Sequence, residues 1–260
     1  MTRRLIVRGA PAGIAAMALA LGACDADSSE PRSVEAPHET TSSRATTPSG
    51  TTPAEPTPSD KKTYSPRPGE VQPLARDDRE VTVRPGRYAL RLTRKLGYEV
   101  DVPDTRFADE GVYLHTPESP GIFLATTAGA TTRLPRHPCT DMTGVPVGPT
   151  AADLANALAA QPVLVTSAPA PVTLGGASGY YLEVLVPTNL DESTCVDEVQ
   201  LYRTGATTMA WEQGYLAHWW ILDVHGVRVV VMNICDVSCS PKNLRTLTTM
   251  AESITFTTSS

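Results

Sequence analysis

The sequence predicts an α+β domain built mainly from antiparallel β-strands, with two helices packed against the sheet. Apolar and polar residues alternate with the period of strands through most of the chain after residue 80. A His225-Gly226 dipeptide separates two long β-rich runs, and two segments of the domain carry helix-capping residues. Strands joined by short turns, with helices segregated from them, are typical of the α+β class.

The alternation is clearest in Tyr98, Val100 and Val102, which share one face of a strand while Glu99 and Asp101 take the other. The same criterion predicts strands over residues 88–92, 98–102, 112–115, 122–126 and 180–186.

The expected hairpin joins Trp219–Val224 to Val227–Ile234 through His225-Gly226, because glycine adopts the positive φ of a two-residue turn without steric cost. Both runs are apolar on both faces, which predicts central strands covered on each side. Leu201–Tyr202 and Thr208–Trp211 are expected to pair with these strands.

Two helices are predicted. Thr150 and Asp153 form a capping box before an alanine-rich run that Pro162 ends, and Ser240-Pro241 provides a cap and a first-turn proline for the second helix. The second helix carries an apolar stripe of Leu244, Leu247, Ala251 and Ile254.

The N-terminal segment predicts export and lipidation. Arg3, Arg4 and Arg8 precede an apolar run that is too short to span a bilayer, and the run closes on Leu21–Cys24, a lipobox (LGAC). We therefore expect a signal peptide over residues 1–23 and an acylated Cys24, which anchors the chain to the outer face of the cytoplasmic membrane. A signal peptide without lipidation is the alternative, and the paired arginines also fit a twin-arginine signal.

Residues 24–79 are expected to form a disordered tether, and residues 80–260 one exported domain. The tether is rich in Pro, Ser and Thr and poor in large apolar residues, so it cannot bury enough surface to offset its chain entropy. Removal of the signal peptide changes the formal net charge from −6 to −9, since three arginines leave with it. This acidic balance argues against nucleic acid as a partner and is compatible with a small ligand or an envelope protein.

Four cysteines follow Cys24, and an even number in an exported chain indicates two disulfides with three possible connectivities. A bridge between Cys235 and Cys239 requires a tight loop, because four residues of extended strand would separate the cysteines too far. The expected pairs are Cys139 with Cys195 and Cys235 with Cys239. A zinc site that uses His137 is the alternative, but it lacks the two spaced ligand pairs of structural zinc sites.

No cofactor, metal site or catalytic set is predicted. Gly175–Gly179 lacks the spacing of a nucleophile elbow and is expected to be a turn. Asp223 lies within an apolar strand, so it must face water or be paired, and a structural ion pair with Arg228 across the hairpin is expected; a site residue is the alternative. The acidic loop clusters do not have the register of a calcium loop; they comprise Asp104, Asp109 and Glu110, and Asp191, Glu192, Asp197 and Glu198.

Several segments resemble an uncharacterised family of actinobacterial lipoproteins and exported domains. They are Pro138-Cys139, Val147–Thr150, Asp153-Leu154, Ala157-Leu158, Val172–Gly176, Gly179–Glu183, Trp220–Val224, Gly226 and Glu252–Ile254. The resemblance covers residues 138–256 and implies a small exported domain, with the cysteines that match Cys139 and Cys195 as its pair. It brings no established activity and no functional residues, and Cys235–Cys239 departs from its pattern. A looser likeness to Mog1/PsbP-type lipoproteins rests on arrangement alone.

The expected function is therefore a lipid-anchored, non-catalytic binding or interaction domain at the cell envelope. The alternatives are an envelope enzyme, such as a hydrolase, whose site assembles from distant residues, and a solute-capturing lipoprotein.

Overall fold

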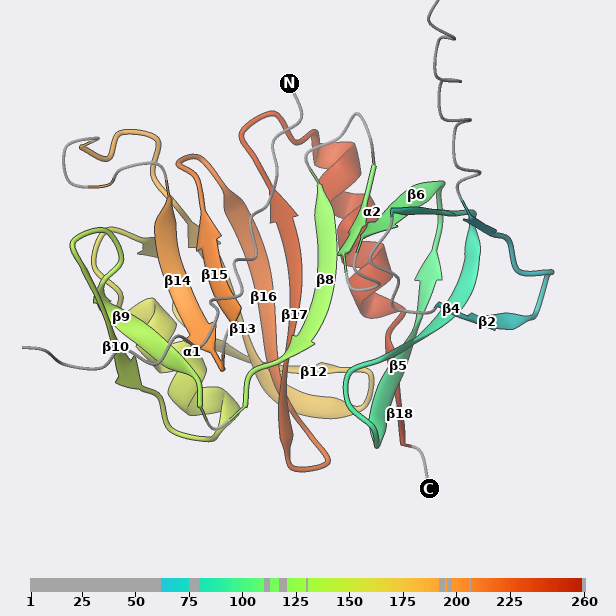
Figure 1. Cartoon of the computed structure of the whole chain (residues 1–260), viewed down its shortest axis with the longest axis horizontal. Helices are drawn as coiled ribbons and strands as arrows, with labels where there is room; N and C mark the ends of the chain where they lie inside the picture. Colours follow the sequence, from blue (N-terminus) through green and yellow to red (C-terminus); the bar gives the residue numbers. More distant parts are fainter. Residues whose placement is uncertain are drawn as a thin grey trace, which may run out of the picture. The chain divides into compact units, whose positions relative to one another are not determined.

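Three β-sheets and two helices make up the described part of the chain (Figure 1). The computed structural model describes residues 62–74, 80–109, 113–116, 121–129, 131–191, 195, 198–205 and 207–258. The predicted signal peptide and Cys24 lie outside these residues.

The largest sheet has ten strands, and the hairpin predicted at residues 219–234 lies in its middle. Its order is β1 (Thr63–Tyr64), β3 (Val81–Val83), β6 (Arg106–Asp109), β7 (Tyr113–His115), β8 (Ile122–Thr127), β17 (Val227–Cys235), β16 (Leu216–Val224), β13 (Ala177–Leu185) and β11 (Val165–Thr166), with β12 (Ala170–Leu174) also paired to β13.

Two four-stranded sheets flank the large one. One has the order β10 (Asp141–Pro146), β9 (Arg133–His137), β14 (Val199–Thr204), β15 (Thr207–Trp211), and the other β18 (Thr255–Thr258), β5 (Leu96–Val102), β4 (Gly86–Arg91), β2 (Val71–Pro73). Only β1–β3 and β2–β4 are parallel among the pairings of the described strands. The predicted α+β class, mainly antiparallel with two helices, is thus confirmed.

The β16–β17 turn has the predicted form. His225 and Gly226 both have positive φ, at 49° and 78°, which suits the twist of the two strands. Residues on both faces of β17 are buried, because its faces belong to different cores.

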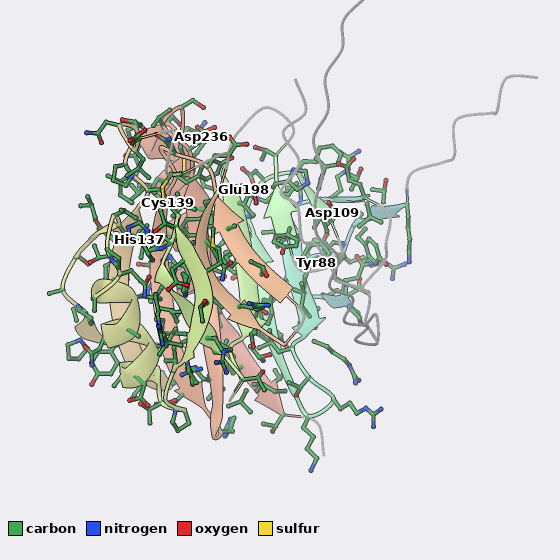
Figure 2. All side chains as sticks on the ribbon, turned by 60° about the vertical axis from the view of Figure 1, so that its left-hand side comes forward. Tyr88, Asp109, His137, Cys139, Glu198 and Asp236 are labelled. Carbon is green, nitrogen blue, oxygen red and sulfur yellow. A yellow bond between two sulfur atoms is a disulfide. The ribbon has the colours of Figure 1, made fainter. Side chains whose placement is uncertain are left out.

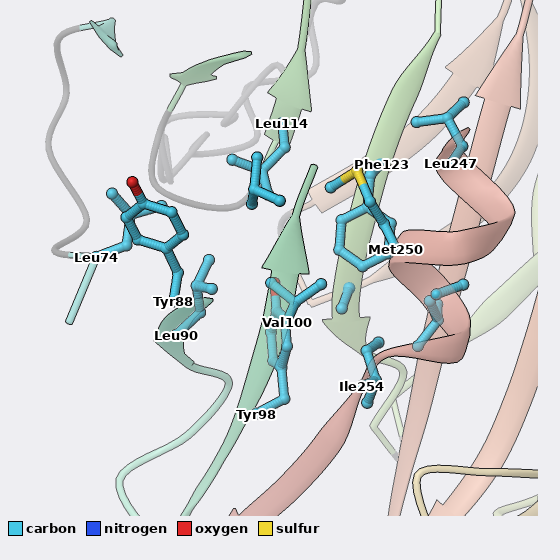
Figure 3. Packing of buried hydrophobic residues seen from close by; sticks show 14 of the residues in the cluster. Leu74, Tyr88, Leu90, Tyr98, Val100, Leu114, Phe123, Leu247, Met250 and Ile254 are labelled. Carbon is cyan, nitrogen blue, oxygen red and sulfur yellow. The ribbon is translucent and has the colours of Figure 1, made fainter. Parts of the chain in front are cut away.

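Each core lies between the large sheet and a layer that contains one helix. On one face, Val230 and Met232 pack with α1 (Ala151–Ala159) and the β9–β14–β15 sheet. On the other, Val229 and Val231 pack with α2 (Pro241–Glu252) and the β4–β5 sheet. Figure 3 shows this second core, where Leu247 and Met250 of α2 approach Phe123 of β8.

Both helices begin at the predicted caps. The Thr150 hydroxyl accepts a hydrogen bond from the Asp153 amide at 3.1 Å, and the Asp153 carboxylate accepts one from the Thr150 amide at 2.9 Å. The Ser240 side chain caps α2 by accepting from the Asn243 amide at 3.2 Å.

The expected pairing of residues 201–202 and 208–211 with the central hairpin is wrong. β14 and β15 pair with each other in a separate sheet, since β8 and β13 already occupy the two free edges of the hairpin. Their aromatic residues instead meet the hairpin face to face: the Trp211 and Tyr202 rings lie 5.7 and 5.8 Å from the Trp219 ring.

The ordered domain starts before residue 80, so the predicted extent of the tether is too long. β1 extends the edge of the large sheet, and the Tyr64 carbonyl accepts a hydrogen bond from the Tyr88 hydroxyl at 3.1 Å. Tyr64 and Leu74 are each only 5% exposed. These buried side chains and the backbone pairing with β3 and β4 hold this segment, although its composition resembles a linker.

The cysteines pair as expected. Cys139 is bonded to Cys195 with a Cα–Cα distance of 4.6 Å, and Cys235 to Cys239 with 5.4 Å. The second bridge lies where β17 meets the loop before α2, which supplies the tight turn that the short spacing requires.

Candidate functional site

An open groove lies between the tips of two hairpins at one end of the large sheet. It has a volume of about 950 Å³ and is lined by the β12–β13 hairpin, by Asp223–His225 and by Phe256; we call it the hairpin groove. Its polar side chains include the exposed Ser178, Asp223 and His225, and Val172 and Phe256 provide apolar surface. This volume falls within the range of small-molecule pockets, roughly 300–1,000 Å³.

Gly179 explains how closely the strands approach beneath this groove. A Cβ atom there would collide with the carbonyl oxygen of Ile221 and lie 2.7 Å from Leu222 Cα. The close pairing places Ser178 directly opposite Asp223. The groove therefore depends on the register between β13 and β16.

Asp223 and Arg228 lie opposite each other in the β16–β17 register, as the sequence indicates. They make no direct ion pair among the contacts of the described residues, because both side chains reach toward the start of α1. Asp223 Oδ1 accepts a hydrogen bond from the Ala151 amide at 3.2 Å. A carboxylate at this position is favourable for the helix N-terminus.

Arg228 is a buried clamp that is only 4% exposed. Its Nε donates to the Ala128 carbonyl at 2.8 Å and its Nη2 to the Gly129 carbonyl at 3.1 Å. Nη1 donates to the carbonyls of Gly148 and Thr150. Burial lowers the Arg228 pKa, and the nearby Asp153 and Asp223 carboxylates oppose this shift. The side chain thus ties the loop after β8 to the loop before α1.

The three polar groups of the hairpin groove do not form a catalytic relay. Ser178, Asp223 and His225 share no hydrogen bond in the described part of the chain, whereas an activated nucleophile needs a base within reach. The arrangement offers a carboxylate, a hydroxyl and an imidazole along one wall, which suits hydrogen bonding to a ligand.

A second polar cluster lies on the α2 side of the large sheet. The Tyr181 hydroxyl donates to Glu183 Oε1 at 3.0 Å and lies 3.0 Å from His218 Nδ1. Because the hydroxyl proton goes to the carboxylate, the hydroxyl oxygen accepts from Nδ1–H, which leaves Nε2 with a lone pair. Burial, followed by the interaction with Glu183, raises the Tyr181 pKa. Opposite His218, Asn233 is fully buried, and neither of its side-chain amide atoms has a hydrogen-bond partner among the residues that the structure describes.

Protonation of His218 is expected to weaken the fold. Burial lowers the His218 pKa, and Glu183 offsets only part of this effect. The unfolded chain, with a histidine pKa of about 6.5, then binds more protons than the folded chain, so the free energy of unfolding falls as the pH drops from about 6.5 to the folded pKa. Urea unfolding at several pH values should show a smaller decline for His218→Gln. His225→Asn, in the exposed turn, is the matched control, and equal pH dependence in His218→Gln and the parent would contradict the prediction.

The zinc alternative is not supported by the contacts of His137. Its Nδ1 accepts from the amides of Cys139 and Thr140 at 3.3 and 3.2 Å, so the imidazole caps a turn beside a cysteine that is already in a disulfide (Figure 2). Among the described residues, no group of three or more His, Cys, Asp or Glu side chains could hold a metal ion.

Of the acidic loop residues, Asp104 forms an ion pair with the buried Arg106 at 2.8 Å. Glu110, Glu192 and Asp197 lie outside the described residues.

Sequence reasoning identified both hairpin turns but missed the hairpin groove and the Tyr181 cluster. The only signal for them was the alternation of β13, which places Tyr181 and Glu183 on one face without revealing their partners.

No helix in the described ranges is long and apolar enough to cross a bilayer. No family model, curated protein or solved structure matches this chain.

Proposed function

We propose that this chain is a membrane-anchored lipoprotein that presents a non-catalytic binding domain, with the hairpin groove as its ligand site. The observation that carries the binding role is the groove itself, since it combines adequate volume with an apolar wall and a few polar groups. The lipobox ending at Cys24 supports the anchor.

The groove favours a small, neutral or cationic ligand with hydrogen-bond donors. Asp223 contributes the carboxylate, and one of its oxygens is already fixed by the Ala151 amide, so the side chain is preorganised. Ser178 and His225 add groups that can donate or accept. The apolar surface of Val172 and Phe256 suits the carbon skeleton of a sugar or amine.

An envelope enzyme is the second candidate, because Ser178, Asp223 and His225 line the same groove. The groove is open to solvent and the three groups do not contact one another, which favours binding over nucleophilic catalysis.

The binding site is tested by titrating the isotope-labelled full chain with a panel of monosaccharides and small primary amines. We expect amide shift changes in residues 172–180 and 223–226, and their loss in Ser178→Trp, which fills the groove. Thr143→Trp, at an exposed position of β10, should keep the response. If no compound of the panel perturbs these amides, the groove is not the site.

The anchor is tested separately by expressing the full chain in a bacterium. The protein should appear in the membrane fraction with an acylated N-terminal Cys24, and Cys24→Ser should remain unacylated. An unmodified Cys24 in the mature protein would refute the anchor and leave the groove unaffected.

A further inference from the structure

The Cys235–Cys239 bridge closes a much smaller ring than its counterpart. The two cysteines are 4 residues apart in the sequence, whereas Cys139 and Cys195 are 56 apart. A cross-link removes less entropy from the unfolded chain when its ring is small, so the smaller ring contributes less to stability. In accessibility the bridges are alike, since each joins a buried cysteine (Cys235 at 2%, Cys195 at 5%) to a half-buried one. The Cys139–Cys195 bridge is therefore an internal control for the effect of accessibility on disulfide reduction.

The half-buried sulfur of the small ring lies at the start of a helix. Cys239 directly precedes Ser240, the N-cap of α2, and the first turn of α2 carries no acidic residue. The unpaired amides of a helix N-terminus favour a nearby thiolate over a thiol. Lys242 adds a positive charge in the same turn. A Cys239 thiolate is therefore a more abundant nucleophile and, when a second thiol displaces it from a mixed disulfide, a better leaving group.

Hydrogen bonds that do not involve sulfur also hold the loop between the cysteines. Asp236, labelled in Figure 2, accepts from the amide and the hydroxyl of Ser238 through Oδ1, both at 2.6 Å. The Cys239 amide donates to the Asp236 carbonyl at 3.0 Å. These contacts do not require the S–S bond, so we expect the two thiols to stay close after reduction and the bridge to re-form as an intramolecular step.

We propose that Cys235–Cys239 is a thiol–disulfide exchange site that reacts with an exposed dithiol, and that Cys139–Cys195 is a structural bridge. A dithiol thiolate attacks Cys239 Sγ, the S–S bond breaks, and Cys235 leaves as a thiolate that takes up a proton. The second thiol of the reagent then displaces Cys239, which leaves as the second thiolate. The reagent is oxidised to its disulfide by two electrons, and the protein pair is reduced to two thiols. This inference does not depend on the ligand proposed for the hairpin groove.

The first experiment equilibrates the full chain in dithiothreitol redox buffers of increasing reducing power, alkylates the free thiols and quantifies each cysteine peptide by mass spectrometry. We expect Cys235–Cys239 to be half-reduced at a ratio of reduced to oxidised reagent at least tenfold lower than Cys139–Cys195, which is about 30 mV for a two-electron couple. The circular dichroism of the selectively reduced chain should remain that of the folded protein. Equal midpoints, or earlier reduction of Cys139–Cys195, would overturn the proposal.

Single-cysteine variants identify the sulfur that exchanges with an external partner. Cys235→Ser leaves Cys239 free and should form a mixed disulfide with oxidised glutathione, whereas Cys239→Ser leaves the buried Cys235 and should react at least tenfold more slowly. Equal or reversed rates would contradict attack at Cys239.

The influence of the helix terminus is tested by charge reversal. Lys242→Glu should slow the alkylation of Cys239 in the Cys235→Ser background several-fold at neutral pH, because the thiolate loses a favourable charge. Lys95→Glu, in the exposed turn between β4 and β5, changes the net charge equally and should have no effect. An unchanged rate in Lys242→Glu would refute activation by the α2 terminus.

Discussion

Replacing Arg228 with methionine is expected to lower the free energy of unfolding by at least about 1.5–3 kcal/mol, the contribution typical of a hydrogen bond to a charged group. Methionine keeps the apolar stem but provides none of the hydrogen bonds to the carbonyls of Ala128, Gly129, Gly148 and Thr150. The carbonyl of Ala128, which is fully buried, would lose the Arg228 donor, and the start of α1 would lose its connection to the loop after β8.

Urea unfolding of the full chain measures this effect. Arg87→Met is the matched control, because Arg87 pairs with Glu99 and Asp101 at the surface, with 29% of its side chain exposed. Exposed ion pairs contribute only about 0–1 kcal/mol. If Arg228→Met lost no more stability than Arg87→Met, the clamp would not have the role inferred from its contacts.

Removal of the Cys139–Cys195 bridge by the double Ser variant is expected to cost about 4 kcal/mol, against about 2 kcal/mol for the Cys235–Cys239 bridge, from the chain-entropy relation for rings of these sizes. The long bridge joins the β9–β10 turn to the segment before β14, so its loss also frees the edge of the sheet that covers α1. Buried Cys195 and half-buried Cys139 pack against the same core.

Thermal and urea unfolding should therefore show a clearly larger loss of stability in the double variant that lacks Cys139–Cys195 than in the one that lacks Cys235–Cys239. An equal loss of stability in both, or a larger loss for the short ring, would show that ring entropy does not govern these bridges. The result does not depend on the proposed exchange chemistry, because each double variant lacks both cysteines of one bridge.

The sequence predicted individual elements well because their signals are local. The His225-Gly226 turn, the Thr150 capping box and the Ser240 cap each depend on residues within a few positions, and all three are present. The two-sided hydrophobicity of β16 and β17 also correctly indicated central strands. The expected pairing of the cysteines rested on the same kind of local constraint, the tight loop between Cys235 and Cys239.

Strand partners and the hairpin groove followed from contacts between distant segments. β14 has the strand pattern that the sequence suggested, but nothing local distinguishes hydrogen bonding to the hairpin from packing over Trp219, which is what it does. The weakly apolar segment around Tyr64 is held by its pairing with β3 and by the hydroxyl of Tyr88, which lies 24 residues away in the sequence.

The sequence alone determined the α+β class, the helix starts, the central hairpin and the expectation of an exported, disulfide-bonded chain, because turn, cap and alternation signals act over short distances. The tertiary structure alone decided which strands share a sheet, that Asp223 and Arg228 both serve the start of α1, and that two hairpin tips enclose a groove. Register and packing between segments far apart in the chain create these features, and no short stretch of sequence contains them.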